Sequence, residues 1–538
     1  MANTALLVLT NPLKIGKILP VIKKQHVLKI LYIKYLPELK NDATKNKYLI
    51  SSHLPHKNRT SLHFQIVANT YALATKFLPK VDVRVLICNS KKNHSIIETK
   101  KPIELVIFDK AYTNDDAKIF ILDHVTNSSQ PSPNFVSIAT NNEIDNSSDD
   151  QYQEEQNQTA LKTYKSVVLG GTFDRLHNGH KILLTKAVFH ATEKVTVGVT
   201  DSVLIVNKIL WELIEPCERR IDAVKNFLQD IDSSLSYDVV PINDIYGPTQ
   251  YDPTFEMIVV SEETQRGGQK INELRSQKGL NILDIEVVKL VHEEIENFNR
   301  NENEELKISS SNSRIRLLGT RLKTPDISKK PLRPYIIGLT GGIASGKSSV
   351  AAKLESLGAG VVYCDKIAHE LYEPGKKCFN LVVQCFGNEI LTEDGRINRK
   401  ALGDIVFKDK KKLDQLNQAV WPAILDTALN QVQQLQAQNK EIIIMEAAVL
   451  IQAKWQHICH EIWTCIIPHN EAIKRLVERN NLSVEEAELR IKAQPSNIEQ
   501  VNEATVVLST LWSHEITLKQ VQKAWDLLKK FLSEHSTN

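Results

Sequence analysis

The stretch GGIASGKS, from Gly341 to Ser348, constrains the fold more than any other part of this sequence. It follows the apolar run YIIGLT and precedes SVAAKLESLG, whose apolar residues recur at helical spacing. A strand, a turn with the spacing GxxxxGK(S/T) and a helix together form a loop whose backbone N–H groups can surround a phosphate. We expect Lys347 to reach the β- and γ-phosphates of a nucleotide, and the Ser348 hydroxyl to bind Mg²⁺.

A second glycine-rich turn, GGTFDRLHNGH, runs from Gly170 to His180 after the strand pattern YKSVVL. Gly170 and Gly171 let a phosphate approach the backbone because glycine has no Cβ. His177 and His180 are three residues apart, so on a first helical turn both can donate to one phosphoryl group. Taken alone, such a pair is also explained by a turn and a helix cap.

Length and composition indicate a multidomain α/β protein. A chain of 538 residues is too long for one hydrophobic core. The formal net charge of +3 gives no reason to expect nucleic acid as a partner. Seven scattered cysteines without a CxxC pair favour reduced thiols over a zinc site. No apolar run reaches the roughly 18 residues of a membrane-spanning helix, so we expect no transmembrane segment.

Shifts in composition predict three domains and two linkers. We expect a small α/β domain over residues 1–126, in which we find no chemical motif. Residues 127–160 are rich in Asn, Ser, Gln and acids, which predicts a flexible linker. A second α/β domain is expected over 161–321, a proline-containing linker over 322–334, and a third α/β domain over 335–538. The sequence shows no internal repeat.

The start of the chain contains lysines but no acidic residue before Glu38. The plain interpretation is a strand, ALLVLT, followed by a basic amphipathic helix. A mitochondrial address is the alternative, although such peptides favour Arg and Ser, which are missing here. We expect a cytoplasmic protein, with mitochondrial association and peripheral membrane contact by this region left open.

The second domain resembles the nucleotidylyltransferase superfamily. GGTFDRLHNGH is similar to its T/HxGH signature, and ISSSNSR, ending at Arg314, is similar to its ISSTxxR element, with Ser311 where Thr is commoner. YGPT and VVSEETQRGGQKIN are similar to phosphopantetheine adenylyltransferases of the eukaryotic type. The resemblance implies that His177, His180 and Lys208 steady the α-phosphate of ATP while the 4'-phosphate of phosphopantetheine attacks it, releasing dephospho-CoA and pyrophosphate.

The same resemblance implies a set of binding residues. The candidates for the substrate are Lys208, Arg219 and Tyr246. The candidates for ATP are Gly170, Gly171, Thr172, Phe173, His180, Ser309, Ser310, Ser311 and Arg314.

The third domain resembles dephospho-CoA kinase through IGLTGGIASGKSS, the Asp365 segment, GRINRKALGDIVF, WPAI and RIKAQ. The resemblance implies that Asp365 is the base for the ribose 3'-hydroxyl, and that Arg399 contacts the substrate. Taken alone, Asp365 is also explained as a helix N-cap. The candidates for ATP here are Gly341, Gly342, Ile343, Ala344, Ser345, Gly346, Lys347, Ser348, Arg479 and Arg490, with Ser348 as the metal ligand.

Three positions depart from the kinase pattern. Tyr363 stands where the family commonly has the first Asp of Asp-x-Asp, and Trp421 stands where many members have His. An acid is often found near Gln452, whereas EIIIMEAAVLIQ supplies only Glu446. These departures make a weakened kinase conceivable.

Together the two resemblances predict two doubly wound parallel-sheet domains, a Rossmann-like HxGH nucleotidylyltransferase and then a P-loop kinase, preceded by a small α/β domain. This order resembles the bifunctional coenzyme A synthases and implies ATP, 4'-phosphopantetheine and dephospho-CoA as partners, with Mg²⁺ accompanying ATP. One alternative is a nicotinamide mononucleotide adenylyltransferase fused to a nucleoside kinase. Another is a scaffold that binds nucleotides without turnover.

Overall fold

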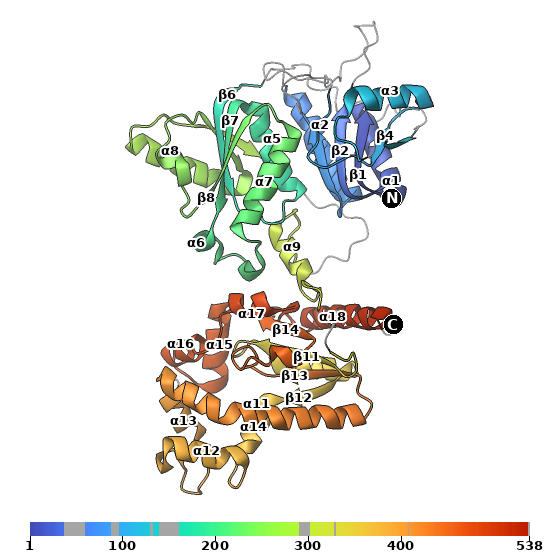
Figure 1. Ribbon diagram of the computed structural model, residues 1–538. Helices are drawn as coiled ribbons and strands as arrows, with labels where there is room; N and C mark the ends of the chain where they lie inside the picture. The colour runs from blue at the N-terminus through green and yellow to red at the C-terminus, as the bar shows by residue number, and fades with distance from the viewer. Residues whose placement is uncertain are drawn as a thin grey trace. The chain divides into compact units, whose positions relative to one another are not determined.

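The computed structural model describes residues 1–36, 60–87, 96–129, 133–138, 161–289, 302–325, 327, 330–406 and 408–535 (Figure 1). The chain divides into two compact units. Unit 1 comprises Met1–Arg300 and Glu304–Asn312, and unit 2 comprises Asn301–Asn303 and Ser313–Asn538. The described residues form three five-stranded sheets in which all strand pairs are parallel, so the expected α/β class is confirmed.

The first sheet of unit 1 has the order β3-β2-β1-β4-β5, with β1 in the centre. Its central strands are buried on both faces, which explains why they are apolar runs without alternation. The strands are β1 (Ala2–Leu9), β2 (Val27–Tyr35), β3 (Asp82–Leu86), β4 (Leu105–Phe108) and β5 (Asn134–Ser137). The helices are α1 (Ile15–Gln25), α2 (Ser61–Phe77) and α3 (Asn114–His124), with a 3-10 turn at Pro12–Lys14.

The acid-free start of the chain is part of this sheet. The expected strand and helix are confirmed as β1 and α1, and Ile15, Ile18, Leu19 and Ile22 of α1 are buried. Cleavage of this stretch as an address peptide would remove the central strand of the sheet.

Strand β5 corrects the start of the expected linker at 127–160. It pairs with β4, and the Phe135 ring meets the Phe108 ring edge to face with centroids 6.3 Å apart. Two adjacent apolar residues, Phe135 and Val136, therefore suffice for an edge strand in a sequence otherwise rich in polar residues. Residues 130–132 and 139–160 of the expected linker lie outside the described residues.

The second sheet of unit 1 has the order β10-β9-β6-β7-β8. Its strands are β6 (Tyr164–Gly171), β7 (Ala191–Thr200), β8 (Ser236–Ile242), β9 (Met257–Ser261) and β10 (Asp284–Val288). Its helices are α5 (Asn178–His190), α6 (Ser202–Ile205), α7 (Cys217–Ile231) and α8 (Gln265–Gln277), with 3-10 turns at Trp211–Leu213, Gly247–Gln250 and Glu262–Thr264. Helix α9 (Ser310–Leu317) follows and contains the boundary between the units.

The two sheets of unit 1 have the same topology. Numbered from its own first strand, each sheet has the order 3-2-1-4-5. One continuous hydrophobic core includes residues of both sheets, such as Leu7 and Val167, and of the helices that cover them, such as Tyr71 and Phe189. The repeat is thus visible in the fold although the sequence shows none.

Unit 2 has a sheet of order β12-β13-β11-β14-β15. Its strands are β11 (Tyr335–Gly341), β12 (Gly360–Tyr363), β13 (Ile442–Glu446), β14 (Glu461–Ile466) and β15 (Val506–Ser509). Its helices are α10 (Lys347–Ser356), α11 (Cys364–Leu371), α12 (Lys377–Phe386), α13 (Arg399–Val406), α14 (Lys410–Ala437), α15 (His469–Asn480), α16 (Val484–Lys492), α17 (Asn497–Glu503) and α18 (His514–His535), with 3-10 turns at Asn388–Ile390 and Trp455–Ile458.

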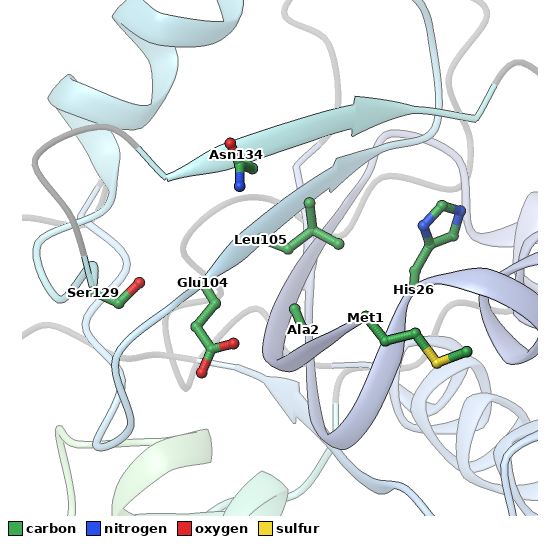
Figure 2. A pocket seen from close by; sticks show the side chains of 7 residues that line it. All are labelled: Met1, Ala2, His26, Glu104, Leu105, Ser129 and Asn134. Atoms are coloured by element: carbon green, nitrogen blue, oxygen red, sulfur yellow. The ribbon is translucent and has the colours of Figure 1, made fainter.

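A hollow of about 540 Å³ opens at the amino ends of strands in the first sheet (Figure 2). It is lined by Met1, Ala2, His26, Glu104, Leu105, Ser129 and Asn134. Ligands of open parallel sheets bind at the carboxyl ends of the strands, so the hollow lies at the opposite edge from the usual site. Of the helices that the structure describes, none has the length and apolar character required to cross a bilayer.

Candidate active sites

The turn after β6 brings together three residues that the sequence singled out. His177 is the N-cap of α5, and its Nδ1 accepts the N–H of His180 at 3.4 Å. The two imidazole rings stack with centroids 3.8 Å apart. Ser310 donates to the Asp174 carbonyl at 2.9 Å and lies 3.5 Å from His177 Nε2. The ISSSNSR element therefore meets the HNGH element.

Both histidines of this turn favour the neutral form. Burial, followed by the charge of Lys208, lowers the pKa of His180 to about 3. Burial also lowers the pKa of His177, and His180 and Lys181 lower it further while Asp174 acts in the opposite direction. An anion next to the rings would favour their protonated form, so this turn is electrostatically suited to a phosphate.

Arg220 organises the glycine-rich turn, whereas Arg219 is exposed on the first turn of α7. The buried Arg220 donates from Nη1 to the carbonyls of Thr172 and Thr200, at 2.8 Å each, and from Nε to the Glu215 carbonyl at 2.8 Å. The sequence interpretation chose Arg219 and missed Arg220. Helical spacing could have predicted that Arg220 is buried, because it shares one face of α7 with Val224, Phe227, Leu228 and Ile231.

The other predicted residues of this turn lie close by. Gly170 and Gly171 end β6, Thr172 accepts a hydrogen bond from the Thr200 hydroxyl at 3.1 Å, and Phe173 is buried beside His180 with centroids 5.3 Å apart. Lys208 is exposed, and its charge acts on His180.

The start of α9 is fixed by the buried side chain of Asn312. It accepts the N–H of Glu305 at 2.8 Å and donates to the carbonyls of Glu305 and Lys307 at 2.9 and 3.1 Å. Ser309 accepts the N–H of Asn312 at 3.1 Å. Ser310, Ser311 and Arg314 follow on this helix, and Arg314 is only 1% exposed.

Tyr246 is half-buried before the 3-10 turn Gly247–Gln250 and packs against an apolar cluster that contains Val168 and Phe255. A hollow of about 360 Å³ lies against this turn and β8. The buried Arg275 holds the turn by donating to the carbonyls of Thr249 and Asp252 at 2.6 and 2.9 Å. The structure thus gives Tyr246 a packing role, and the cavity is lined by its neighbours Gly247 and Pro248.

In unit 2, the predicted phosphate loop lies between β11 and α10. Gly341 and Gly346 have φ values of +149° and +80°, which favour glycine. A Cβ at Gly346 would lie 2.8 Å from the Thr510 side chain. Lys347 is 8% exposed, and its ammonium donates to the Gly342 carbonyl at 3.3 Å. The Lys347 side chain therefore lies over the loop. A phosphate bound in the loop would contact both the backbone and this ammonium.

Three residues that the sequence interpretation did not assign hold this loop. The N–H of Ile343 donates to Gln494 Oε1 at 2.6 Å. Arg475 donates to the Ala344 carbonyl at 3.2 Å and to the Thr510 carbonyl at 2.7 Å. The Thr510 hydroxyl donates to the Ser345 carbonyl at 2.8 Å. Residue spacing could not have predicted the contacts made by Ile343, Ala344 and Ser345, because each of them joins segments more than 130 residues apart.

Glu446 provides a carboxylate beside the loop. It ends β13, is 2% exposed, and accepts the Ser348 hydroxyl at 3.4 Å. Burial, followed by the charge of Asp365, raises the pKa of Glu446, while Lys347 acts in the opposite direction. A hydroxyl and a carboxylate are hard oxygen ligands of the kind that Mg²⁺ prefers. Ser348 and Glu446 therefore fit the implied metal, and the sequence interpretation did not assign Glu446 to it.

Asp365 and Arg399 meet around His369. Asp365 is exposed on the first turn of α11, and His369 lies one turn later. Arg399 Nη2 donates to the His369 carbonyl at 3.2 Å. Burial, followed by Arg399, lowers the pKa of His369, whereas Asp365 acts in the opposite direction. A carboxylate and a guanidinium thus lie close together at the end of β12.

The two other predicted arginines lie on neighbouring helices. Arg479 is exposed near the end of α15, and its Nε donates to Asn480 Oδ1 at 3.0 Å. Arg490 is half-buried on α16, one turn before Gln494.

Structural contacts account for the three departures from the kinase pattern. The Tyr363 hydroxyl donates to Glu355 at 3.3 Å, and Trp421 packs against the core under α14. Gln452 donates to the Ala493 carbonyl at 3.0 Å, next to the loop-binding Gln494. In register, Tyr363 pairs with Glu446, so the carboxylate missing from β12 is available from the adjacent strand.

Two family models match this chain. Residues 168–316 match the cytidylyltransferase-like family, and residues 335–512 match the dephospho-CoA kinase family. The prediction that both kinds of domain occur in one chain is confirmed.

Individual relatives match over one part of the chain. The chain is 40% identical over 186 residues to the dephospho-CoA kinase of Carboxydothermus hydrogenoformans. This match covers 35% of the chain and 90% of the relative. The chain is 36% identical over 201 residues to that of Moorella thermoacetica, covering 37% and 95%. A solved dephospho-CoA kinase from Campylobacter jejuni is 25% identical with a TM-score of 0.28, covering 36% of this chain and 96% of that one.

Proposed function

The chain belongs to the dephospho-CoA kinase family, and on this premise we propose that it performs the last two steps of coenzyme A synthesis. Unit 1 transfers the adenylyl group of ATP to 4'-phosphopantetheine. Unit 2 then phosphorylates the ribose 3'-hydroxyl of the dephospho-CoA that results.

For the second reaction, Asp365 accepts the proton of the 3'-hydroxyl as its oxygen attacks the γ-phosphorus of ATP and ADP leaves. Lys347 and the loop N–H groups from Gly341 to Ser348 hold the phosphates. Arg399 contacts the substrate, as its position beside Asp365 supports. Arg479 and Arg490, on α15 and α16, serve the ATP site. Ser348 and Glu446 would hold Mg²⁺, which neutralises charge on the β- and γ-phosphates when bound.

For the first reaction, an oxygen of the 4'-phosphate attacks the α-phosphorus of ATP, and the bond to the β-phosphate breaks to release pyrophosphate. His177, His180 and Lys208 donate to the α-phosphate, where charge develops in the transition state. Gly170 to Phe173 and the serines of α9 with Arg314 accommodate the remaining phosphates. Arg219 and Tyr246 are kept as contacts for phosphopantetheine, and a cavity lined by Gly247 and Pro248 lies against the turn that follows Tyr246.

One observation carries the two-step proposal. The nucleotidyltransferase-like match at 168–316 directly precedes the kinase match at 335–512, and the product proposed for the first is the substrate named for the second. A common chain raises the local concentration of such an intermediate.

The proposal is tested by offering the full chain ATP and Mg²⁺ with either 4'-phosphopantetheine or nicotinamide mononucleotide. We expect pyrophosphate and an adenylylated product with 4'-phosphopantetheine only. Turnover of nicotinamide mononucleotide instead would assign unit 1 to the other adenylyltransferase class. Binding of ATP without pyrophosphate release from either acceptor would make unit 1 a scaffold.

A further inference from the structure

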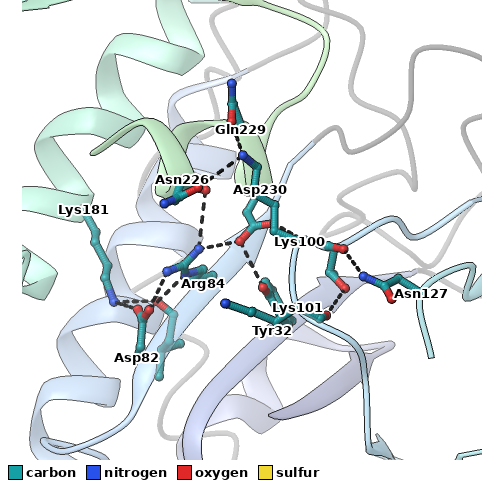
Figure 3. Close-up of polar contacts among 12 residues, drawn as sticks. Tyr32, Asp82, Arg84, Lys100, Lys101, Asn127, Lys181, Asn226, Gln229 and Asp230 are labelled. Atoms are coloured by element: carbon teal, nitrogen blue, oxygen red, sulfur yellow. Dashed lines mark hydrogen bonds and ion pairs between the residues drawn. The ribbon is translucent and has the colours of Figure 1, made fainter. Parts of the chain in front are cut away.

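The helix that carries the HNGH element is held by the lobe that precedes it, here called the N-terminal lobe (residues 1–138). Asn178, next to His177, donates to the Tyr71 carbonyl at 3.2 Å and to the Thr75 hydroxyl at 2.9 Å, both on α2. Lys181, next to His180, donates to Asp82 Oδ1 on β3 at 2.6 Å (Figure 3). A direct neighbour of each histidine is therefore bound to the N-terminal lobe.

The contact at Lys181 belongs to a charge network in which Lys181 and Asp230 are buried and Asp82 is half-buried (Figure 3). Arg84 donates to Asp82 at 3.0 and 2.7 Å and also pairs with Asp230 at the end of α7. The Tyr32 hydroxyl donates to Asp230 at 3.0 Å. Although burial opposes it, the charges of Lys181 and Arg84 hold the pKa of Asp82 below its ordinary value. Buried, paired charges of this kind tolerate little displacement, because an unpaired partner would be left in the core.

Apolar packing joins the same elements. Phe64 of α2 meets Phe189 of α5 edge to face with centroids 5.8 Å apart. The ring centroids of Tyr71 and of Phe227 on α7 lie 6.4 Å apart. A backbone hydrogen bond adds to this packing, since the N–H of Ile87 donates to the Ile231 carbonyl at 2.7 Å. The N-terminal lobe and α5 thus share one core.

The N-terminal lobe has the topology of its neighbour without the histidines. Lys14 is the N-cap of α1 and Lys17 its third residue, the places that His177 and His180 take in α5. At this turn the Asp109 carboxylate accepts the N–H of Thr10 at 3.0 Å. A side chain of the lobe itself occupies backbone donors there, so the turn is not arranged as a second phosphate site.

We propose that the N-terminal lobe is a positioning element for adenylyl transfer, and that Thr75 and Asp82 are positioning residues that aim His177 and His180 at the α-phosphate. The inference rests on the proposed function of unit 1. Donors that stabilise a transition state act through their geometry, and a misplacement of about 1 Å can cost about 100-fold in rate. Thr75 and Asp82 act through Asn178 and Lys181 and touch no substrate.

The first test compares Thr75→Val with Thr75→Ser in the full chain. Valine keeps the shape of threonine but removes one of the two acceptors of Asn178, leaving the Tyr71 carbonyl, whereas serine keeps the hydroxyl. We expect Thr75→Val to lower kcat for adenylyl transfer about 10-fold with little change in KM for ATP, and Thr75→Ser to restore it. Phosphorylation of added dephospho-CoA should stay unchanged in both and reports that unit 2 is intact.

The second test removes a charge with Lys181→Met. Lys181 disfavours protonation of His177, so its loss should raise the pKa of His177 and move the limb of the kcat profile that reports this group to higher pH. His180 and Asp174 are the other ionisable groups that act on His177 and are left in place. A merely structural effect would lower the amount of active protein without moving the profile. Asp82→Asn should lower kcat, and Asp123→Asn, on the exposed face of α3, should not.

A third measurement does not depend on the substrate. The imidazole resonances of His177 and His180 in histidine-labelled protein should shift in Thr75→Val and return in Thr75→Ser. Unchanged resonances together with wild-type kcat in Thr75→Val would overturn the positioning role. Failure of the wild-type chain to adenylylate 4'-phosphopantetheine would contradict the proposed function instead, and the resonances would still decide the role of the lobe.

Discussion

At the scale of single residues, the sites consist of residues whose spacing is visible in the sequence and of others that only the fold brings in. His177, His180, Lys347 and Ser348 were predicted because two short motifs contain them. Arg220, Glu446, Arg475 and Gln494 come from other elements and meet the loops through tertiary contacts. Glu446 has the clearest chemical consequence, because it places a buried carboxylate beside the predicted metal ligand Ser348.

Glu446 should make Mg²⁺ binding in unit 2 sensitive to pH. Its pKa is raised, so protons compete with the cation closer to neutrality than for an ordinary glutamate. We expect the apparent Mg²⁺ affinity in the kinase assay to fall as pH is lowered from about 7 to about 5.5. Glu446→Gln should bind Mg²⁺ weakly at every pH and lose this dependence.

Glu441→Gln is the matched control. Glu441 precedes the same strand, is exposed, and pairs with Arg333 at the surface, so its removal should change little. If Glu446→Gln kept the wild-type Mg²⁺ requirement and pH dependence, Glu446 would not be a ligand.

At the scale of elements, both candidate sites are built on the turn of a strand–turn–helix unit. The apolar runs predicted the central strands because parallel strands are buried on both faces. They could not predict β5, a short edge strand inside a polar segment, nor the repeated topology of unit 1, which leaves no trace in residue identity. The turn after β11 shows how geometry adds to the motif, since Gly346 adopts a left-handed conformation directly against Thr510.

Substitution of Gly346 should therefore impair the loop more than substitution of a glycine that has a positive φ but no close neighbour. Ala at Gly346 has both a backbone cost of about 1–2 kcal/mol and a contact at 2.8 Å with Thr510. Gly375 has a similar φ of +83° with nothing within 4 Å of its Cβ position. We expect Gly346→Ala to lower kcat/KM for dephospho-CoA phosphorylation at least about 10-fold and Gly375→Ala to change it little. Equal effects of the two would mean that the Thr510 contact does not matter.

At the scale of the whole chain, two turns that we propose bind phosphate follow one another, one with histidines and one with a lysine. The sequence predicted their order and their families, because both motifs are local and specific. It did not predict the role of the first 138 residues, which contain no motif and act on the neighbouring helix through buried contacts. The account therefore gives the N-terminal lobe a place in the first reaction, and it assigns the second reaction to unit 2.

The most direct test of this two-site account follows coenzyme A formation from 4'-phosphopantetheine, ATP and Mg²⁺ by the full chain, by His180→Ala and by Lys347→Ala. The account predicts that the wild-type chain releases pyrophosphate and ADP in equal amounts for each coenzyme A formed. His180→Ala should form coenzyme A only from added dephospho-CoA, with adenylyl transfer reduced by about 100-fold or more. Lys347→Ala should accumulate dephospho-CoA. Loss of both reactions in either folded variant, or full coenzyme A synthesis by Lys347→Ala, would contradict the account.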